Sequence, residues 1–100
     1  MEKKKPHYSL SEIKAILLLR GMDALTYTAR NNSRLMGLDE SDVKAILLGL
    51  QQGMLFKSMT THSDNKVWQD VYHAPCPNGK TAYIKLTLQA GAVVIQFKEK

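Results

Sequence analysis

The chain has 100 residues, and its composition of 44% hydrophobic and 23% charged side chains is that of a globular protein, which excludes a disordered tail. This length predicts one domain, residues 1–100, with a single hydrophobic core. The 14 basic and 9 acidic side chains give a formal net charge of +5, which favours a polyanionic partner but does not require one.

The first half of the chain is predicted to be helical. Ser9 and Glu12 have the spacing of a capping box, and the apolar period that follows predicts a helix that ends near Gly21. A second helix is expected within residues 24–36. A third is expected within residues 39–50, where an aspartate suited to the N-cap precedes an apolar face.

After Gly53 the hydrophobic period changes from that of a helix to that of a strand. Asn78 and Gly79 are a strong hairpin signal, because both residues tolerate a positive φ. Four strands are expected, at residues 55–61, 66–74, 80–89 and 92–98. Helices followed by an antiparallel meander predict an α+β fold, with the N-terminal helices packed on one face of a twisted, mainly antiparallel sheet.

The alternation of side chains along these strands assigns residues to the two faces of the sheet. Two apolar rows should face the helices, namely Ala82, Ile84, Leu86 and Leu88, and Val93, Ile95 and Phe97. If Phe56 and Trp68 also face the helices, the face away from them, called the open face, carries Leu55, Lys57, Met59, Val67, Gln69, Val71, Tyr83, Lys85, Val94, Gln96 and Lys98.

The open face has two interpretations. An antiparallel sheet often has one solvated face, on which lysine, glutamine and tyrosine serve solubility alone, and this is the more common explanation of such a pattern. The apolar members of the open face count against it, because they form a shallow floor on which nucleic-acid bases could lie.

Cysteine, histidine and hydropathy patterns disfavour several other classes of site. Cys76 is the only cysteine, so an internal disulfide and a cysteine metal cage are excluded. His7, His62 and His73 lack a ligand motif, and a metal held by the last two across a hairpin is a minor alternative. The apolar run at residues 15–19 is too short to span a membrane, so a cytoplasmic protein is expected.

Two blocks of the sequence resemble the MqsR family of bacterial toxins. The stretch KSMTTHSDNKVWQDVY at residues 57–72 and the terminal FKEK carry the likeness, together with MEK and PH near the start. The likeness is close over residues 54–73 and 81–100 and looser through the helical half. It implies a small mRNA interferase with a RelE-like ribonuclease fold that is paired with an antitoxin.

The resemblance implies a catalytic set whose motifs match Lys57, Gln69, Tyr83 and Lys98. The alternation of side chains places the same four residues on the open face. Substrate contacts are expected from Lys85, Met59, Phe56 and His73. The chain departs from the family pattern at Phe56 and His73, where a relative has tyrosine and arginine.

The activity implied by the resemblance is cleavage of single-stranded mRNA at short GC-initiated sites such as GCU. The 2′-hydroxyl of the RNA attacks the adjacent phosphate, so no metal or other cofactor is expected. Lys57 and Lys98 are expected to neutralise the crowded phosphate. Tyr83 is expected to donate a hydrogen bond or a proton, and Gln69 to hold the substrate in place.

The resemblance also implies an antitoxin of the MqsA type, a zinc-binding protein with a helix-turn-helix DNA-binding portion. His62 or His73 acting as the general base is an alternative mechanism. Two alternative functions are a non-catalytic RNA-binding module that uses the same basic face, and a protein whose sheet edge only docks another protein. The basic residues at positions 3–5 are expected to be solvated charges.

Overall fold

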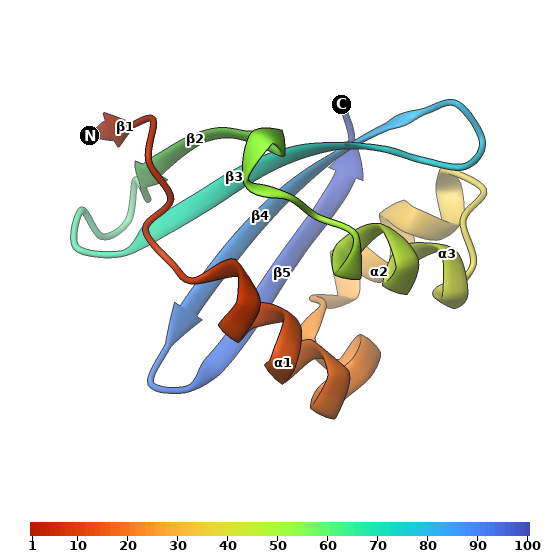
Figure 1. Ribbon diagram of the computed structural model, residues 1–100, viewed down its shortest axis with the longest axis horizontal. Coiled ribbons are helices and arrows are strands. Elements are labelled where there is room, and N and C mark those ends of the chain that lie inside the picture. The colour runs from red at the N-terminus through yellow and green to blue at the C-terminus, as the bar shows by residue number, and fades with distance from the viewer.

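The computed structural model describes residues 1–100 and contains three α-helices beside a five-stranded antiparallel sheet (Figure 1). The strands pair in chain order, β1-β2-β3-β4-β5, so the sheet is a meander and the predicted α+β class is confirmed. None of the helices has both the length and the apolar character needed to span a membrane. The elements, with η for a 3-10 helix, are β1 (Glu2–Lys3), α1 (Leu10–Arg20), η1 (Gly21–Ala24), α2 (Tyr27–Leu35), α3 (Glu40–Leu48), η2 (Gln52–Met54), β2 (Leu55–Thr60), β3 (Trp68–Pro75), β4 (Thr81–Gln89) and β5 (Ala92–Glu99).

Each α-helix begins at a residue whose side chain satisfies an amide of the first turn. Ser9, Thr26 and Asp39 each accept a hydrogen bond from the amide three residues later. Only α3 has the reciprocal capping box, because the Asp42 carboxylate also accepts from the Asp39 amide. At the start of α1, Ser9 caps the helix but the side chain of Glu12 returns no bond.

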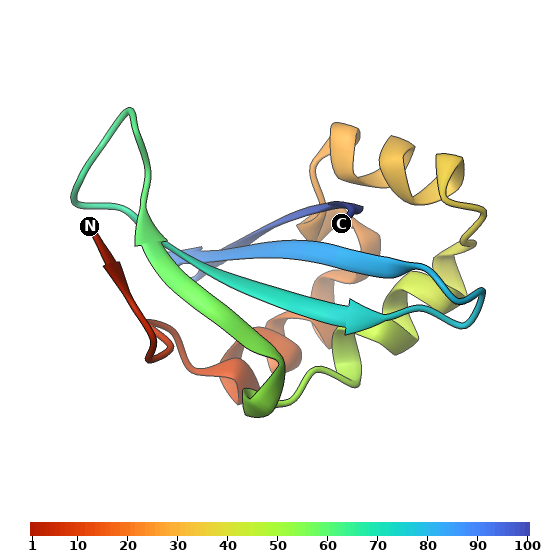
Figure 2. The ribbon, with the colours of Figure 1, turned by 90° about the horizontal axis from the view of Figure 1, so that it is seen from above.

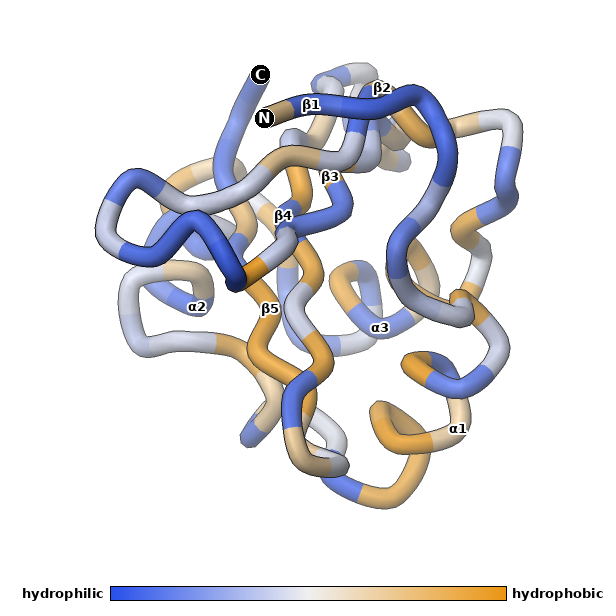
Figure 3. Tube along the Cα trace, turned by 90° about the vertical axis from the view of Figure 1, so that its left-hand side faces the viewer, coloured by the Kyte–Doolittle hydropathy of each residue, from blue (hydrophilic) through white to orange (hydrophobic).

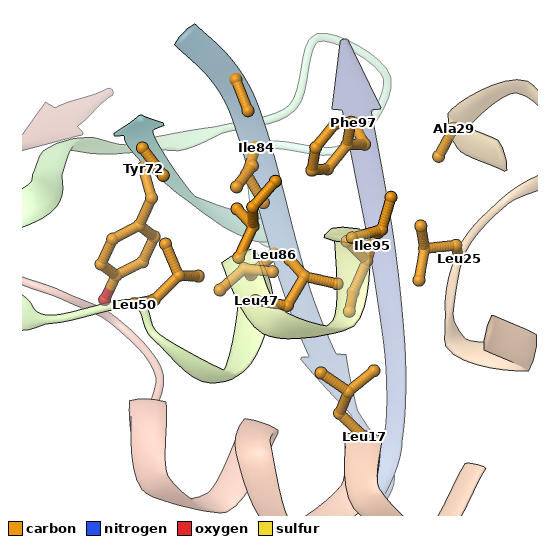
Figure 4. Packing of buried hydrophobic residues seen from close by; sticks show 14 of the residues in the cluster. Leu17, Leu25, Ala29, Leu47, Leu50, Tyr72, Ile84, Leu86, Ile95 and Phe97 are labelled. Carbon is orange, nitrogen blue, oxygen red and sulfur yellow. The ribbon is translucent and has the colours of Figure 1, made fainter. Parts of the chain in front are cut away.

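The hydrophobic core lies between one face of the sheet and helices α1 and α3 (Figure 4). Ile84, Leu86 and Ile95 present the predicted apolar rows of β4 and β5 to this core and are at most 1% exposed. Leu17 of α1 and Leu47 of α3 pack against them. The alternation predicted for β4 and β5 is therefore confirmed, since a slip of one residue would expose the whole row.

A β-bulge at Phe56 corrects the face assignment of the first predicted strand. Leu55 pairs with Tyr72 and Lys57 pairs with Val71, so Phe56 is the extra residue of β2. Leu55 consequently turns inward and packs against the core, whereas Phe56 turns outward and is 43% exposed. The prediction was wrong for these two residues, because strict alternation does not hold across a bulge.

The N-terminal segment forms a short strand that the sequence did not indicate. Glu2 pairs with Met59 in β1 and β2. The segment is held by the carboxylate of Asp70, which is 0% exposed and accepts hydrogen bonds from the amides of His7 and Tyr8 at 2.9–3.0 Å. These amides compensate the buried charge.

The same segment covers Trp68, because Lys3 Nζ lies 4.3 Å from the centroid of a Trp68 ring and the His7 ring stacks on it at 5.1 Å. Lys3 is therefore not a freely solvated charge, contrary to the expectation for the basic start of the chain.

Helix α2 lies along the free edge of β5 (Figure 2). Arg20 Nη1, the Thr26 amide and Asn32 Nδ2 donate to the carbonyls of Val93, Ile95 and Phe97 at 3.1–3.3 Å. These bonds satisfy carbonyls that an edge strand otherwise exposes. Figure 2 shows α1 and α3 on one side of the sheet and α2 on the other, so α2 borders the open face, while its Ala29 packs into the core at the edge of β5.

Candidate active site

Three rows of side chains cross the open face, each made of residues that strand pairing or, for Phe56, ring stacking brings together. The first row consists of Phe56, His73, Tyr83 and Lys98. The second row consists of Lys57, Val71, Lys85 and Gln96. The third row begins with Met59 and Gln69. Adjacent strands lie about 4.8 Å apart, so side chains of one row are within reach of one another.

The first row is a run of aromatic rings that ends at a cation. The rings of Phe56 and His73 stack with their centroids 4.5 Å apart and an interplanar angle of 20°. The Tyr83 ring follows His73 at 5.3 Å, and Lys98 Nζ lies 5.0 Å from the centroid of Tyr83. Because every nucleic-acid base presents a π-face, the exposed side of Phe56 is a surface on which a base can stack.

The second row carries positive charge above an apolar floor. Val71 is 0% exposed although it belongs to the open face, and it pairs with Lys57 on one side and Lys85 on the other. Aliphatic lysine stems cover such a floor while their ammonium groups remain in water.

Lys57 is the only lysine of the open face that has an acidic partner. Its Nζ donates to the Glu2 carboxylate at 2.6 Å. This hydrogen bond raises the pKa of Lys57 and lowers the pKa of Glu2. Lys57 is consequently cationic at neutral pH, which suits charge neutralisation and not proton abstraction.

Lys85 and Lys98 flank Tyr83 without a carboxylate partner. The ion pairs of the chain are Lys57–Glu2 and Lys80–Glu99. Lys98 Nζ and Lys85 Nζ lie 5.0 and 5.9 Å from the centroid of the Tyr83 ring. Two unpaired ammonium groups beside a phenol provide a place for an anionic group on the open face.

A groove of about 370 Å³ begins at this cluster and continues between β5 and α2. Its walls include Tyr83, Lys85, Gln96 and Lys98 from the sheet, and Thr28 and Asn32 from α2. No carboxylate lines it. Figure 3 shows the contrast between the hydrophilic residues that dominate α2 and the hydrophobic residues along β5.

Comparison with known proteins decides the family. A family model described as "Motility quorum-sensing regulator, toxin of MqsA" matches residues 5–99. The chain belongs to the MqsR toxin family. The mRNA interferase toxin MqsR of Escherichia coli (strain K12) is 38% identical over 100 residues, which cover the whole of both chains. The family resemblance identified in the sequence is confirmed.

In this MqsR-family chain, the four residues predicted to be catalytic come from four adjacent strands and share the open face. The set contains Lys57 of β2, Gln69 of β3, Tyr83 of β4 and Lys98 of β5. The four residues are not equally close to one another. Gln69 lies four residues along β3 from His73, the partner of Tyr83, a separation of about 13 Å along the strand.

The two histidines considered as alternatives have different surroundings. His73 Nε2 is buried without a hydrogen-bond partner, and burial, helped by the charge of Lys100, lowers the pKa of His73. His62 is exposed in the turn between β2 and β3, six residues before β3 begins at Trp68, whereas His73 lies well inside β3. No group of three histidine, cysteine or acidic side chains is placed to hold a metal ion.

Sequence reasoning missed the part of this MqsR-family site that α2 contributes. Gln96 had been assigned to the open face but not to the site, and Thr28 and Asn32 had no assigned role. The sequence of a polar helix such as α2 predicts only that the helix is exposed to solvent. The edge bonds between the α2 region and β5 place these side chains beside Tyr83 and Lys98, and no sequence pattern announces such bonds.

Proposed function

We propose that this MqsR-family toxin cleaves single-stranded mRNA at short GC-initiated sites such as GCU and thereby inhibits translation. Family membership makes the protein an endoribonuclease of the mRNA interferase class. The observation that carries the site assignment is the placement of Lys57, Tyr83 and Lys98 on one accessible face, beside an aromatic row and a groove without acidic side chains.

The proposed chemistry uses the 2′-hydroxyl of the substrate as the nucleophile. A bond forms between this oxygen and the adjacent phosphorus, and the bond to the 5′-oxygen of the next nucleotide breaks. The products are a cyclic phosphate and a 5′-hydroxyl. Because the nucleophile belongs to the RNA, the protein has to orient it in line, neutralise the phosphorane and move protons.

Tyr83 and Lys98 act at the scissile phosphate in this proposal. The 2′-hydroxyl loses its proton to water as it attacks, and the phenol donates a proton to the leaving 5′-oxygen and regains one from water. Lys98, whose Nζ lies 5.0 Å from the ring centroid, stabilises a non-bridging oxygen. Lys57 adds a second positive charge from the neighbouring row, and binding of the phosphate competes with its contact to Glu2.

The remaining predicted residues bind the strand around the reacting phosphate. Lys85 contacts a phosphate oxygen without taking part in the chemistry. Phe56 and His73 provide a stacking surface for a base. Gln69 and Met59 lie in the third row, about 13 Å from the first along β3, so they hold a neighbouring part of the RNA and not the same phosphate.

His73 is the alternative general base, since its lowered pKa leaves the imidazole neutral at pH 7. In that case, the cleavage rate falls as the pH decreases through a value below the ordinary histidine pKa of 6.5. A His73→Gln variant removes this acidic limb if His73 is the base. If the limb is absent from the parent, or persists in the variant, electrostatic stabilisation by the lysines remains the proposed main effect.

The cognate antitoxin is proposed to be of the MqsA type, a zinc-binding protein with a helix-turn-helix DNA-binding portion. The family description, which names the toxin as that of MqsA, supports this proposal. Co-expression with the gene encoded beside the toxin should restore growth of cells that produce it. Growth that stays arrested with this neighbour present contradicts the pairing.

The decisive test incubates the purified protein in EDTA with an unstructured RNA that contains all triplets. Specific cuts in the parent, together with slower cutting by Lys57→Ala and Lys98→Ala, support the nuclease and its site. Lys44→Ala, which removes an exposed lysine of α3, is the matched control. Retention of RNA without cuts indicates the binding module. RNA that is neither cut nor retained indicates a protein that only docks another protein. Equal rates for all variants refute the site assignment.

A further inference from the structure

The groove between α2 and β5 is partly lined by polar side chains that take no part in the proposed cleavage step. Its volume of about 370 Å³ is within the usual range for a small-molecule site, which starts at about 300 Å³. It opens at Tyr83 and Lys98, where the reacting phosphate is proposed to lie, so a strand bound at that phosphate extends directly into it.

Three polar side chains in this groove have unused hydrogen-bonding groups. The Thr28 hydroxyl and the Gln96 carboxamide make no hydrogen bond with the rest of the chain, although both line the groove. Asn32 donates from Nδ2 to the Phe97 carbonyl at 3.1 Å, which fixes its carboxamide and leaves the oxygen free. Carboxamides offer a donor and an acceptor together, which is what a base edge requires.

The wall that carries these groups is held in place by the fold. Thr28 and Asn32 are one turn apart on α2, so they project from the same face of the helix. The bonds from the Thr26 amide to Ile95 and from Asn32 to Phe97 tie that helix to the edge of β5. A rigid wall discriminates between bases better than a mobile one, because its hydrogen-bonding groups keep their positions.

The groove also favours an anionic ligand over a cationic or neutral one. Lys85 and Lys98 line it without carboxylate partners, and none of its lining residues is acidic. A single nucleotide matches this combination, because its phosphate takes the cations and its base takes the polar wall.

We propose that this groove is the subsite for the nucleotide next to the scissile phosphate, and that Thr28, Asn32 and Gln96 determine which base is accepted there. The inference rests on the proposed RNA cleavage and adds to it the element that selects the base. Lysine contacts to phosphate position the strand but carry no sequence information, so base selection requires such a wall.

The test compares the parent with Gln96→Leu and Thr28→Val on an RNA library with every base around the cut. We expect the ratio of kcat/KM between the preferred base and its competitors to fall about 10-fold at one position adjacent to the cut, the value of one base-recognising contact. Gln89→Leu makes the same chemical change at an exposed residue on the open face at the far end of β4, and it should leave the ratio unchanged. Base preferences that equal those of the parent in both groove variants overturn the inference.

A second measurement separates this inference from the nuclease proposal. A short 2′-O-methylated RNA containing GCU lacks the nucleophile and can be titrated into the protein by NMR. Shifts at the amides of Thr28, Asn32 and Gln96 support the groove even if the parent cleaves no RNA. Cleavage by the parent without shifts at these amides refutes the assignment of the groove as a nucleotide subsite and leaves the nuclease proposal in place.

Discussion

Asp70 is predicted to be the largest single contribution of a polar side chain to the stability of this protein. Its carboxylate is 0% exposed and accepts from the amides of His7 and Tyr8 at 2.9–3.0 Å. A hydrogen bond to a charged group contributes about 1.5–3 kcal/mol, so the loss of the bonds to two donors in Asp70→Ala should lower the free energy of unfolding by about 3–6 kcal/mol. Asp70→Asn keeps one acceptor oxygen without the charge, so this variant should lose less of the free energy of unfolding, about 1–3 kcal/mol.

The assay is urea unfolding of the parent and both variants, combined with amide hydrogen exchange. Exchange at His7 and Tyr8 should accelerate in Asp70→Ala, where both amides lose their acceptor, and accelerate less in Asp70→Asn, which keeps one acceptor oxygen. Asp23→Ala removes an exposed carboxylate that accepts no hydrogen bond and serves as the control. A loss below about 1 kcal/mol in Asp70→Ala, with exchange at the two amides unchanged, would show that the buried carboxylate does not hold the N-terminal segment.

Three further perturbations test other parts of the structure. Glu2→Gln removes the 2.6 Å contact to Lys57, so the pKa of Lys57, followed by NMR titration, should return toward its ordinary value. The lowered pKa of Glu2 means that the contact stabilises the fold above pH 4.5 and is lost as the pH falls through the lowered value, so parent and variant should become equally stable in acid. Tyr72→Phe removes a buried hydroxyl that has no partner, and a stability gain of up to about 1 kcal/mol is expected by thermal unfolding. Burial, helped by Asp70, raises the pKa of Tyr72 to about 12, so folding favours the neutral phenol, and the stability that the parent loses as the pH rises from 10 toward 12 should be retained in the variant. Phe56→Leu should weaken binding of a 2′-O-methylated RNA by about 1–3 kcal/mol, the value of one stacked base, with little change in unfolding because the ring is 43% exposed. Unchanged RNA affinity in this variant would contradict the stacking role.

The open face was predictable where the strands are regular. Along β4 and β5 the chain alternates without interruption, so Tyr83, Lys85 and Lys98 could be assigned to the same face from periodicity alone, and the structure agrees. The assignment failed at Leu55 and Phe56, where one extra residue in β2 shifts the phase. A bulge depends on the partner strand, and the local pattern of hydrophobic residues does not encode it.

The sequence by itself determined the α+β class, the family, the helix starts and the polar face of the sheet, because each of these depends on local patterns: caps, periods and motif blocks. Only the tertiary structure decided that the N-terminal residues form a fifth strand with Glu2 on Lys57, that Asp70 anchors them, and that α2 borders the open face while its Ala29 packs into the core. These features come from contacts between residues more than fifty positions apart along the chain, such as Glu2 with Lys57 and Asn32 with Phe97, and no periodicity in a single segment reports them.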